Sequence, residues 1–194
     1  MMINTKYVQR FLALVMATAV MSFGVAQAEP LPPVTYLQVE TNGILNNDER
    51  GATSNVVLDF QVGAGSSITS LRWDVNVTSY VGSYLSEMKV TFSDTLGHGI
   101  TFTPGDGDDF DGTVDYAGFQ DFGELGQVFQ VGGDGILRLE FHDGFKDLAF
   151  DEPEGMWNSG TLIFGIAPVP EPPTYAMALG GLLLLSSAIR RRRP

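Results

Sequence analysis

The chain of 194 residues contains no cysteine, which excludes disulfide bonds, thiol catalysis and cysteine-ligated metals. Basic residues are also scarce, because 11 lysines and arginines stand against 23 acidic residues, and the formal net charge is −12. All 23 acids lie between Glu29 and Glu171, where only five bases occur, so this stretch carries a charge of −18. A surface of this sign repels phosphate backbones, which excludes nucleic acid as a partner.

Catalytic motifs are lacking as well. The chain has no Gly-x-Ser-x-Gly elbow, no His-Glu-x-x-His pair and no phosphate-binding glycine loop. Its two histidines, His98 and His142, are far apart in the sequence. We therefore expect a non-catalytic protein. A secreted hydrolase stays as an alternative, because paired carboxylates for glycoside hydrolysis are available by number alone.

Residues 1–28 predict a secretory signal peptide. A basic start is followed by the apolar stretch FLALVMATAV and by a small-x-small cleavage site at Ala26 and Ala28. The alternative is an uncleaved membrane anchor, but the apolar stretch is short and the cleavage site is well placed. Export through the Sec translocon would then give a mature chain that begins at Glu29.

Residues 168–194 form a second segment of distinct composition. They begin with PVPEPP, continue with an uncharged run at 174–189, and end with four arginines. The run would span about 24 Å as a helix at about 1.5 Å per residue, slightly less than a bilayer core of about 30 Å. Arginine side chains can extend outward to make up the difference. Their charge favours the cytoplasmic side, so we expect one transmembrane helix in the inner membrane.

This three-part array resembles the PEP-CTERM sorting signal, which exosortase, a membrane transpeptidase of Gram-negative bacteria, recognises and processes. By this resemblance Pro170, Glu171 and Pro172 form the recognition box. The stop-transfer cluster consists of Arg190, Arg191, Arg192 and Arg193. Members of the family often belong to bacteria that make exopolysaccharide and biofilm, and the same tail occurs on some ice-binding proteins. A plain tail anchor is the alternative, although it has no use for a Pro-Glu-Pro box.

Residues 29–167 have an apolar period of two, which is typical of strands with one buried face. The clearest case is LRWDVNVT, in which Trp73 is expected on the buried side. Glycine-rich turns separate the candidates. Strands are predicted at 34–40, 56–62, 71–78, 88–92, 99–103, 127–131, 137–141 and 162–166. About eight short strands predict an all-β protein, a β-sandwich of jelly-roll type.

Two stretches of this module, 68–94 and 135–166, are similar to a proprotein-convertase P-domain-like jelly roll. The first has a strand, a Tyr-Val-Gly turn and a second strand, and the second ends in a closing strand that contains WNSGTL. The usual turn acid is replaced around Ser83 and Tyr84, and Lys146 stands where another acid is expected. The resemblance implies a fold and says little of function.

The densest group of acids lies in PGDGDDFDGTVD at residues 104–115. Like charges this close repel one another, so the loop is either fully hydrated or neutralised by a cation. Ca²⁺ suits such a loop because it accepts six to eight oxygen ligands in irregular geometry, although the spacing does not fit an EF-hand. The candidate ligands are Asp106, Asp108, Asp109 and Asp111. A second acidic loop at 143–154 is a further candidate.

Tyr80 and Tyr84 flank a turn, where exposed rings could stack on sugars, although ordinary packing is the alternative. The sequence as a whole predicts an exported, non-catalytic surface or matrix protein that exosortase sorts. The inner membrane and polysaccharide are the other expected partners. A carbohydrate-binding or ice-binding module is the alternative to a matrix role. Ice binding requires a regular threonine or aromatic ladder, which the sequence does not show.

Overall fold

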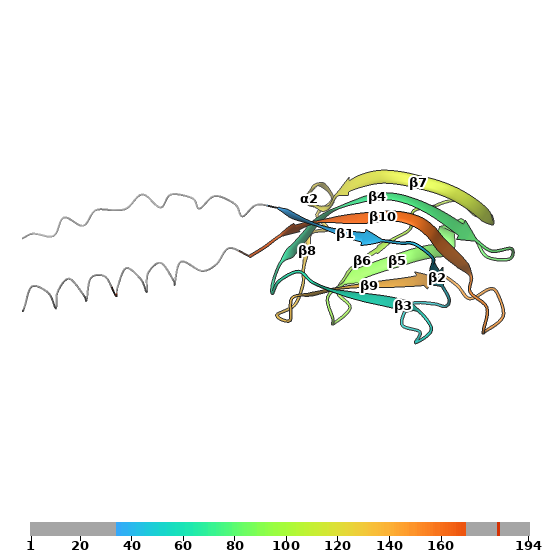
Figure 1. Ribbon diagram of the computed structural model, residues 1–194, viewed down its shortest axis with the longest axis horizontal. Coiled ribbons are helices and arrows are strands. Elements are labelled where there is room, and N and C mark those ends of the chain that lie inside the picture. Colours follow the sequence, from blue (N-terminus) through green and yellow to red (C-terminus); the bar gives the residue numbers. More distant parts are fainter. Residues whose placement is uncertain (1–33, 170–181, 183–194) are drawn as a thin grey trace, which may run out of the picture. The chain divides into compact units, whose positions relative to one another are not determined.

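The computed structural model describes residues 34–169 and residue 182. The predicted signal peptide lies outside the described residues, and so do the Pro-Glu-Pro box and the arginine cluster. Residues 34–169 form an all-β module of two antiparallel sheets that lie face to face (Figure 1). Within the described part of the chain, no helix has both the length and the apolar character needed to cross a membrane.

The first sheet has the strand order β1-β10-β4-β7, and the second has the order β3-β9-β5-β6. The first sheet consists of β1 (Thr35–Glu40), β10 (Gly155–Ala167), β4 (Ser67–Ser79) and β7 (Gly112–Asp121), with the short strands β2 (Ile44–Asn46) on β10 and β8 (Phe129–Gln130) on β4. The second sheet consists of β3 (Val56–Gln61), β9 (Ile136–Asp143), β5 (Met88–Ser93) and β6 (Gly99–Phe102). Two single-turn helices are η1 (Leu85–Glu87) and α2 (Phe122–Leu125).

The strand pairs are nested in the sequence. β1 pairs with β10, β3 with β9, β4 with β7, and β5 with β6. This is the order produced when one long antiparallel ribbon folds over on itself, and it defines a jelly roll. The expected sandwich is therefore present. One consequence is that the chain enters and leaves the module side by side, because Thr35 pairs with Ile166.

All eight predicted strands are present, but the structure adds two that the sequence analysis did not predict, β2 and β7. The larger omission is β7, whose inward positions include Gly118 and Gln120 in place of aliphatic side chains. Glycine is required at 118 because a Cβ there would lie 2.3 Å from the Cζ2 atom of Trp73. Residues 112–115 of the acidic stretch therefore belong to a strand and not to a loop, and Asp115 lies on the outer face of β7.

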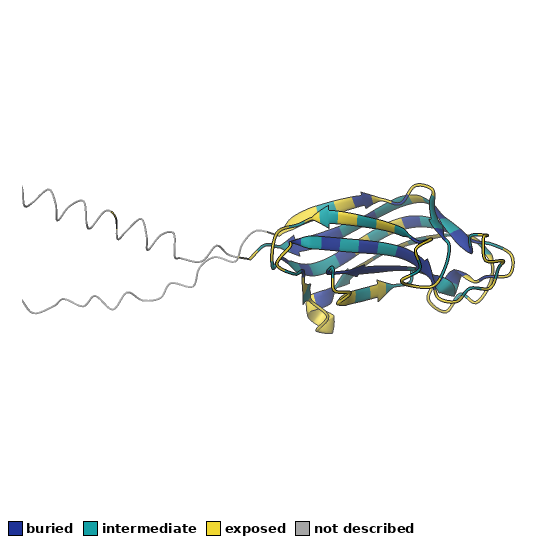
Figure 2. Cartoon of the chain, turned by 90° about the horizontal axis from the view of Figure 1, so that it is seen from below, coloured by how far each residue is buried: buried dark blue, intermediate teal, exposed yellow. Residues whose placement is uncertain are grey.

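The core lies between the two sheets and is rich in aromatic rings. Buried and less buried residues alternate along the strands, as expected when one face of each sheet is covered (Figure 2). The ring of Phe92 lies edge-on to Phe164 with centroids 5.1 Å apart, and that of Phe141 lies edge-on to Trp157 at 5.4 Å. Trp73 is only half-buried and contacts Phe102, with centroids 4.7 Å apart.

Phe92→Ala should destabilise the module by about 3–5 kcal/mol, because it leaves a cavity among the rings that surround Phe92 in the core. Urea unfolding followed by tryptophan fluorescence measures the change. Phe119→Ala is the matched control, since Phe119 is 53% exposed and its removal should cost less than about 1 kcal/mol. Equal losses from the two substitutions would contradict this assignment of the core.

Candidate functional site: a groove on the outer face of the first sheet

The outer face of the first sheet is hollow near the end where the chain enters and leaves. The strand register aligns Tyr36, Gly165, Ser70 and Asp121 in one row across the four strands. Gly165 and Ser70, in the middle of the row, have no side chain and a short side chain, respectively. The surface is therefore depressed at the centre of the row and raised at its two edges. Gly165 is required here, because a Cβ at this position would lie 2.3 Å from the Ser70 Oγ atom.

The neighbouring row supplies the other wall of this hollow. It contains Gln38, Ile163, Arg72 and Phe119 in the same strand order. The hollow between the rows has a volume of about 500 Å³, and a second hollow of about 530 Å³ continues from it past Arg72 and Phe119. These volumes are in the range of ligand sites. We call the two hollows together the outer groove, lined by Val34, Tyr36, Thr69, Ser70, Arg72, Trp73, Asp74, Ala117, Gly118, Phe119, Asp121, Thr161 and Ile163.

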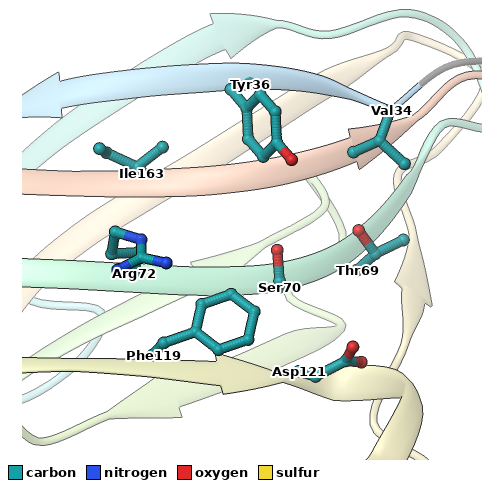
Figure 3. Close-up of a pocket in the computed structure, with 8 residues that line it drawn as sticks. All are labelled: Val34, Tyr36, Thr69, Ser70, Arg72, Phe119, Asp121 and Ile163. Atoms are coloured by element: carbon teal, nitrogen blue, oxygen red, sulfur yellow. The ribbon is translucent and has the colours of Figure 1, made fainter.

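Two exposed aromatic rings stand at the sides of the outer groove. Tyr36 is 73% exposed on β1 and Phe119 is 53% exposed on β7. The rings point toward one another across β10 and β4 (Figure 3). Three strand spacings of about 4.8 Å separate β1 from β7, so the two strands that carry the rings lie roughly 14 Å apart. Exposed rings at this spacing can contact the apolar faces of one extended ligand.

Arg72 lies at the centre of the outer groove. Its guanidinium carbon is 5.2 Å from the centroid of the Phe119 ring, which is within the range of a cation–π contact. Asp121, at the rim, is engaged elsewhere, because its Oδ1 accepts hydrogen bonds from the backbone amides of Gly123 and Glu124 at the start of α2. Among the lining residues, Arg72 and Asp74 are the exposed charged side chains, and Arg72 is the one base.

The other end of the same face has a closed network of polar side chains. Asn76 donates to Asp115 at 2.6 Å, and Asn158 donates to both Asn76 and Thr78 at 2.7 Å. The hydroxyls of Thr78 and Thr113 lie 2.7 Å apart. Because these groups satisfy one another, this end is less suited to take a ligand than the outer groove.

The four predicted calcium ligands lie in the connection from β6 to β7. Asp108 accepts a hydrogen bond from the Tyr116 hydroxyl at 2.7 Å, and Asp109 accepts one from Ser86 at 2.7 Å. Burial and this bond to Asp108 raise the pKa of Tyr116 above its ordinary value. Asp106 and Asp111 are exposed. In residues 34–169, no three histidine or acidic side chains are placed to hold one metal ion, and calcium binding stays a prediction.

Buried carboxyl groups gather at the end of the module opposite the outer groove. Asp143 is 1% exposed and Glu154 is fully buried, and each has one carboxyl oxygen without a hydrogen-bond partner among the described residues. Lys146 lies 3.0 Å from the other carboxyl oxygen of Glu154. Burial raises the pKa of Asp143 to about 7, and the charges of Glu87 and Glu154 add to this rise. Asp143 is thus held largely as the neutral acid below neutral pH.

Titration of Asp143 should lower the free energy of unfolding as the pH rises from about 5 to 8. The unfolded chain loses the Asp143 proton near pH 4, whereas the folded chain keeps it until about pH 7, so the folded state binds more protons in this range. The full effect is about 4 kcal/mol at 1.36 kcal/mol per pKa unit. Asp143→Asn should remove the part of the pH dependence that Asp143 causes and be more stable than the parent chain at pH 8.

Urea unfolding at pH 5, 6, 7 and 8 measures this dependence. Above pH 5 the carboxyl groups of Asp59, Asp94 and Asp134 contribute little, because their pKa values are lowered. His142 acts in the opposite direction to Asp143 up to about pH 6.5, because burial lowers its pKa and the folded state binds fewer protons there. The raised pKa of Glu87 adds to the fall in stability that Asp143 causes. Asp151→Asn, at an exposed acid of the same loop, is the control and should keep the slope. An Asp143→Asn variant whose stability changes with pH as that of the parent chain does would overturn the assignment to Asp143.

The residues of the outer groove are not those that the sequence analysis selected. Tyr84, chosen there as a sugar-binding ring, is 44% exposed, and Tyr80 is half-buried. They border the turn that follows β4, at the end of that strand opposite the outer groove. Phe119 could have been found from the alternation in GTVDYAGFQD, which places it on the wet side with Thr113 and Asp115. The missing step was recognition of β7.

The comparisons with known proteins add little to what the strand order shows about the fold. No family model matches the chain, and neither does any curated protein. A structure of infectious bursal disease virus, Gx strain, is similar at 14% identity with a TM-score of 0.41, covering 80% of this chain and 38% of that one. A subviral particle of this virus covers 78% and 37%, at 13% identity and a TM-score of 0.35. This chain spans less than two fifths of both, and at these scores the likeness carries no argument.

Proposed function

We propose that this chain is an exported, non-catalytic protein of the cell surface or extracellular matrix, sorted by exosortase, which binds polysaccharide in the outer groove. The observation that carries the binding proposal is the pair of exposed rings, Tyr36 and Phe119, on either side of a hollow with a polar centre. Rings stack on the apolar faces of sugars, and adjacent polar groups can bond to the hydroxyls. The sorting proposal rests on the PEP-CTERM resemblance of residues 168–194.

The composition of the outer groove favours binding over hydrolysis. A glycosidase needs two carboxyl groups on opposite sides of the scissile bond, one to donate a proton and one to act as nucleophile or base. Asp74 and Asp121 are the carboxylates of the outer groove, and Asp121 is engaged with the start of α2. With Asp121 capping the helix, Asp74 is left without a second free carboxylate across the groove.

Removal of either ring from the outer groove should weaken polysaccharide binding by about tenfold, or about 1.4 kcal/mol, since each stacking contact contributes an energy of this size. Tyr36→Ala and Phe119→Ala are the variants. Affinity electrophoresis in gels that contain the producing organism's own matrix polysaccharide gives the dissociation constants. Phe150→Ala is the control, because Phe150 is 89% exposed and lies outside the outer groove. Unchanged affinity in both ring variants would refute this binding surface.

Replacement of Pro170, Glu171 and Pro172 by alanine should stop processing in the native host. The unprocessed protein should keep its apolar tail, have a higher mass and be found in the membrane fraction, because the processing enzyme would lack its recognition box. Mass spectrometry and cell fractionation measure both effects. A second variant with Val169→Ala alone serves as the control. Normal processing of the triple variant would count against exosortase sorting.

A further inference from the structure

Three of the five lysines and arginines in residues 34–169, namely Arg50, Arg72 and Lys89, form no ion pair with a carboxylate. Arg138 makes two bonds to Asp59 at 2.9 and 3.0 Å, and Lys146 pairs with Glu154. In residues 34–169, by contrast, no carboxylate oxygen lies within 4.0 Å of the Arg72 guanidinium nitrogens. Arg72 is exposed, and its guanidinium lies over the face of the Phe119 ring. The guanidinium therefore keeps its hydrogen-bond donors free.

The position of this free cation matters as much as its lack of a partner. Arg72 stands on β4 beside Phe119, at the place where the two hollows of the outer groove meet, whereas Ser70 lies nearer the direct line between the two rings (Figure 3). A sugar chain that contacts both rings crosses β4 near Ser70, two residues from Arg72 on the same face of the sheet. A guanidinium presents its donors as a planar fork that matches the two oxygens of a carboxylate. The ring of Phe119 supports the guanidinium from one side, which reduces the entropy lost when an anion binds.

We propose that the outer groove selects polysaccharides that contain uronic acids, with the sugar carboxylate bound to Arg72 and the neighbouring sugar rings stacked on Tyr36 and Phe119. This inference rests on the proposed polysaccharide binding and names its ligand class. Charge complementarity is confined to Arg72 itself, because the outer groove also contains the carboxylates of Asp74 and Asp121 and most other charges on the module are negative. At 0.1 M salt the Debye length is about 10 Å, so distant acids are screened while a direct ion pair in the outer groove is kept.

The test compares each of two acidic polymers with its own neutral form, so that the members of each pair differ in charge. The full chain is purified in a mild detergent, and its affinity is measured at 0.1 M salt for alginate, for polygalacturonate and for the carboxyl-reduced, neutral form of each. The parent chain should bind at least one acidic polymer about tenfold more tightly than its reduced form. Arg72→Gln should remove this preference and leave the weaker binding to the neutral form. Arg72→Lys should keep part of the preference, because it preserves the charge but not the fork.

Arg50→Gln is the matched control, since it removes the same charge from an exposed arginine outside the outer groove. Thermal melting shows that each variant is folded. Equal loss in the Arg50 and Arg72 variants would assign the effect to net charge and overturn the inference. If acidic and neutral polymers bind equally and Arg72→Gln changes nothing, while Tyr36→Ala still weakens binding, the inference fails and the proposed function stands.

Two further outcomes separate the remaining explanations. If neither these polymers nor the host's matrix polysaccharide is bound, both the inference and the proposed function fail. Vesicles of phosphatidylglycerol test a lipid phosphate as the anion that Arg72 binds. Binding to these vesicles that depends on Arg72, with no binding to acidic polymers, would overturn the inference in favour of a membrane surface.

Discussion

The pairing of β4 with β10 is the constraint on which the rest of the module depends. These are the two longest strands, they lie side by side in the middle of the first sheet, and each contributes to both faces. On the inner face they bury Leu71 and Phe164, whereas on the outer face they supply the floor of the outer groove. A shift of one residue in this register would exchange the two faces, because side chains alternate along a strand. Core and outer groove are thus fixed by the same ladder of backbone hydrogen bonds.

Two glycines, one on β7 and one on β10, shape the surface of this sheet. Gly118 of β7 lies against the indole of Trp73, and Gly165 of β10 lies against Ser70 of β4, each too close for a side chain. Such glycines weaken a strand in isolation, since they add backbone entropy to the unfolded state. Here they create space, at 118 for a ring between the sheets and at 165 for the hollow outside. The same residue type therefore serves the core and the candidate binding surface.

Much of the fold could be predicted from the sequence because one face of most strands is apolar without interruption, as in the alternation from Leu71 to Thr78. The strand β7 escaped prediction because Gly118 and Gln120 break that pattern on its inner side. The outer groove could not be predicted at all. Tyr36, Arg72 and Phe119 are far apart in the sequence, and only the pairing of four strands brings them together. The alternation of residues predicts which side of a strand is buried, but the order of the strands in a sheet depends on the whole chain.

The nested strand order also has a mechanical consequence. β10 is bonded on one edge to β4 and on the other to β1 and β2, and the chain leaves the module directly from its end. Tension applied to the residues after Ala167 therefore acts along the axis of β10, and hydrogen bonds on both edges share the load at the same time. A ligand bound over Ile163 and Arg72 would pull against this same strand. The direct route for force between such a ligand and the residues after Ala167 thus runs through β10, which is hydrogen-bonded along both edges.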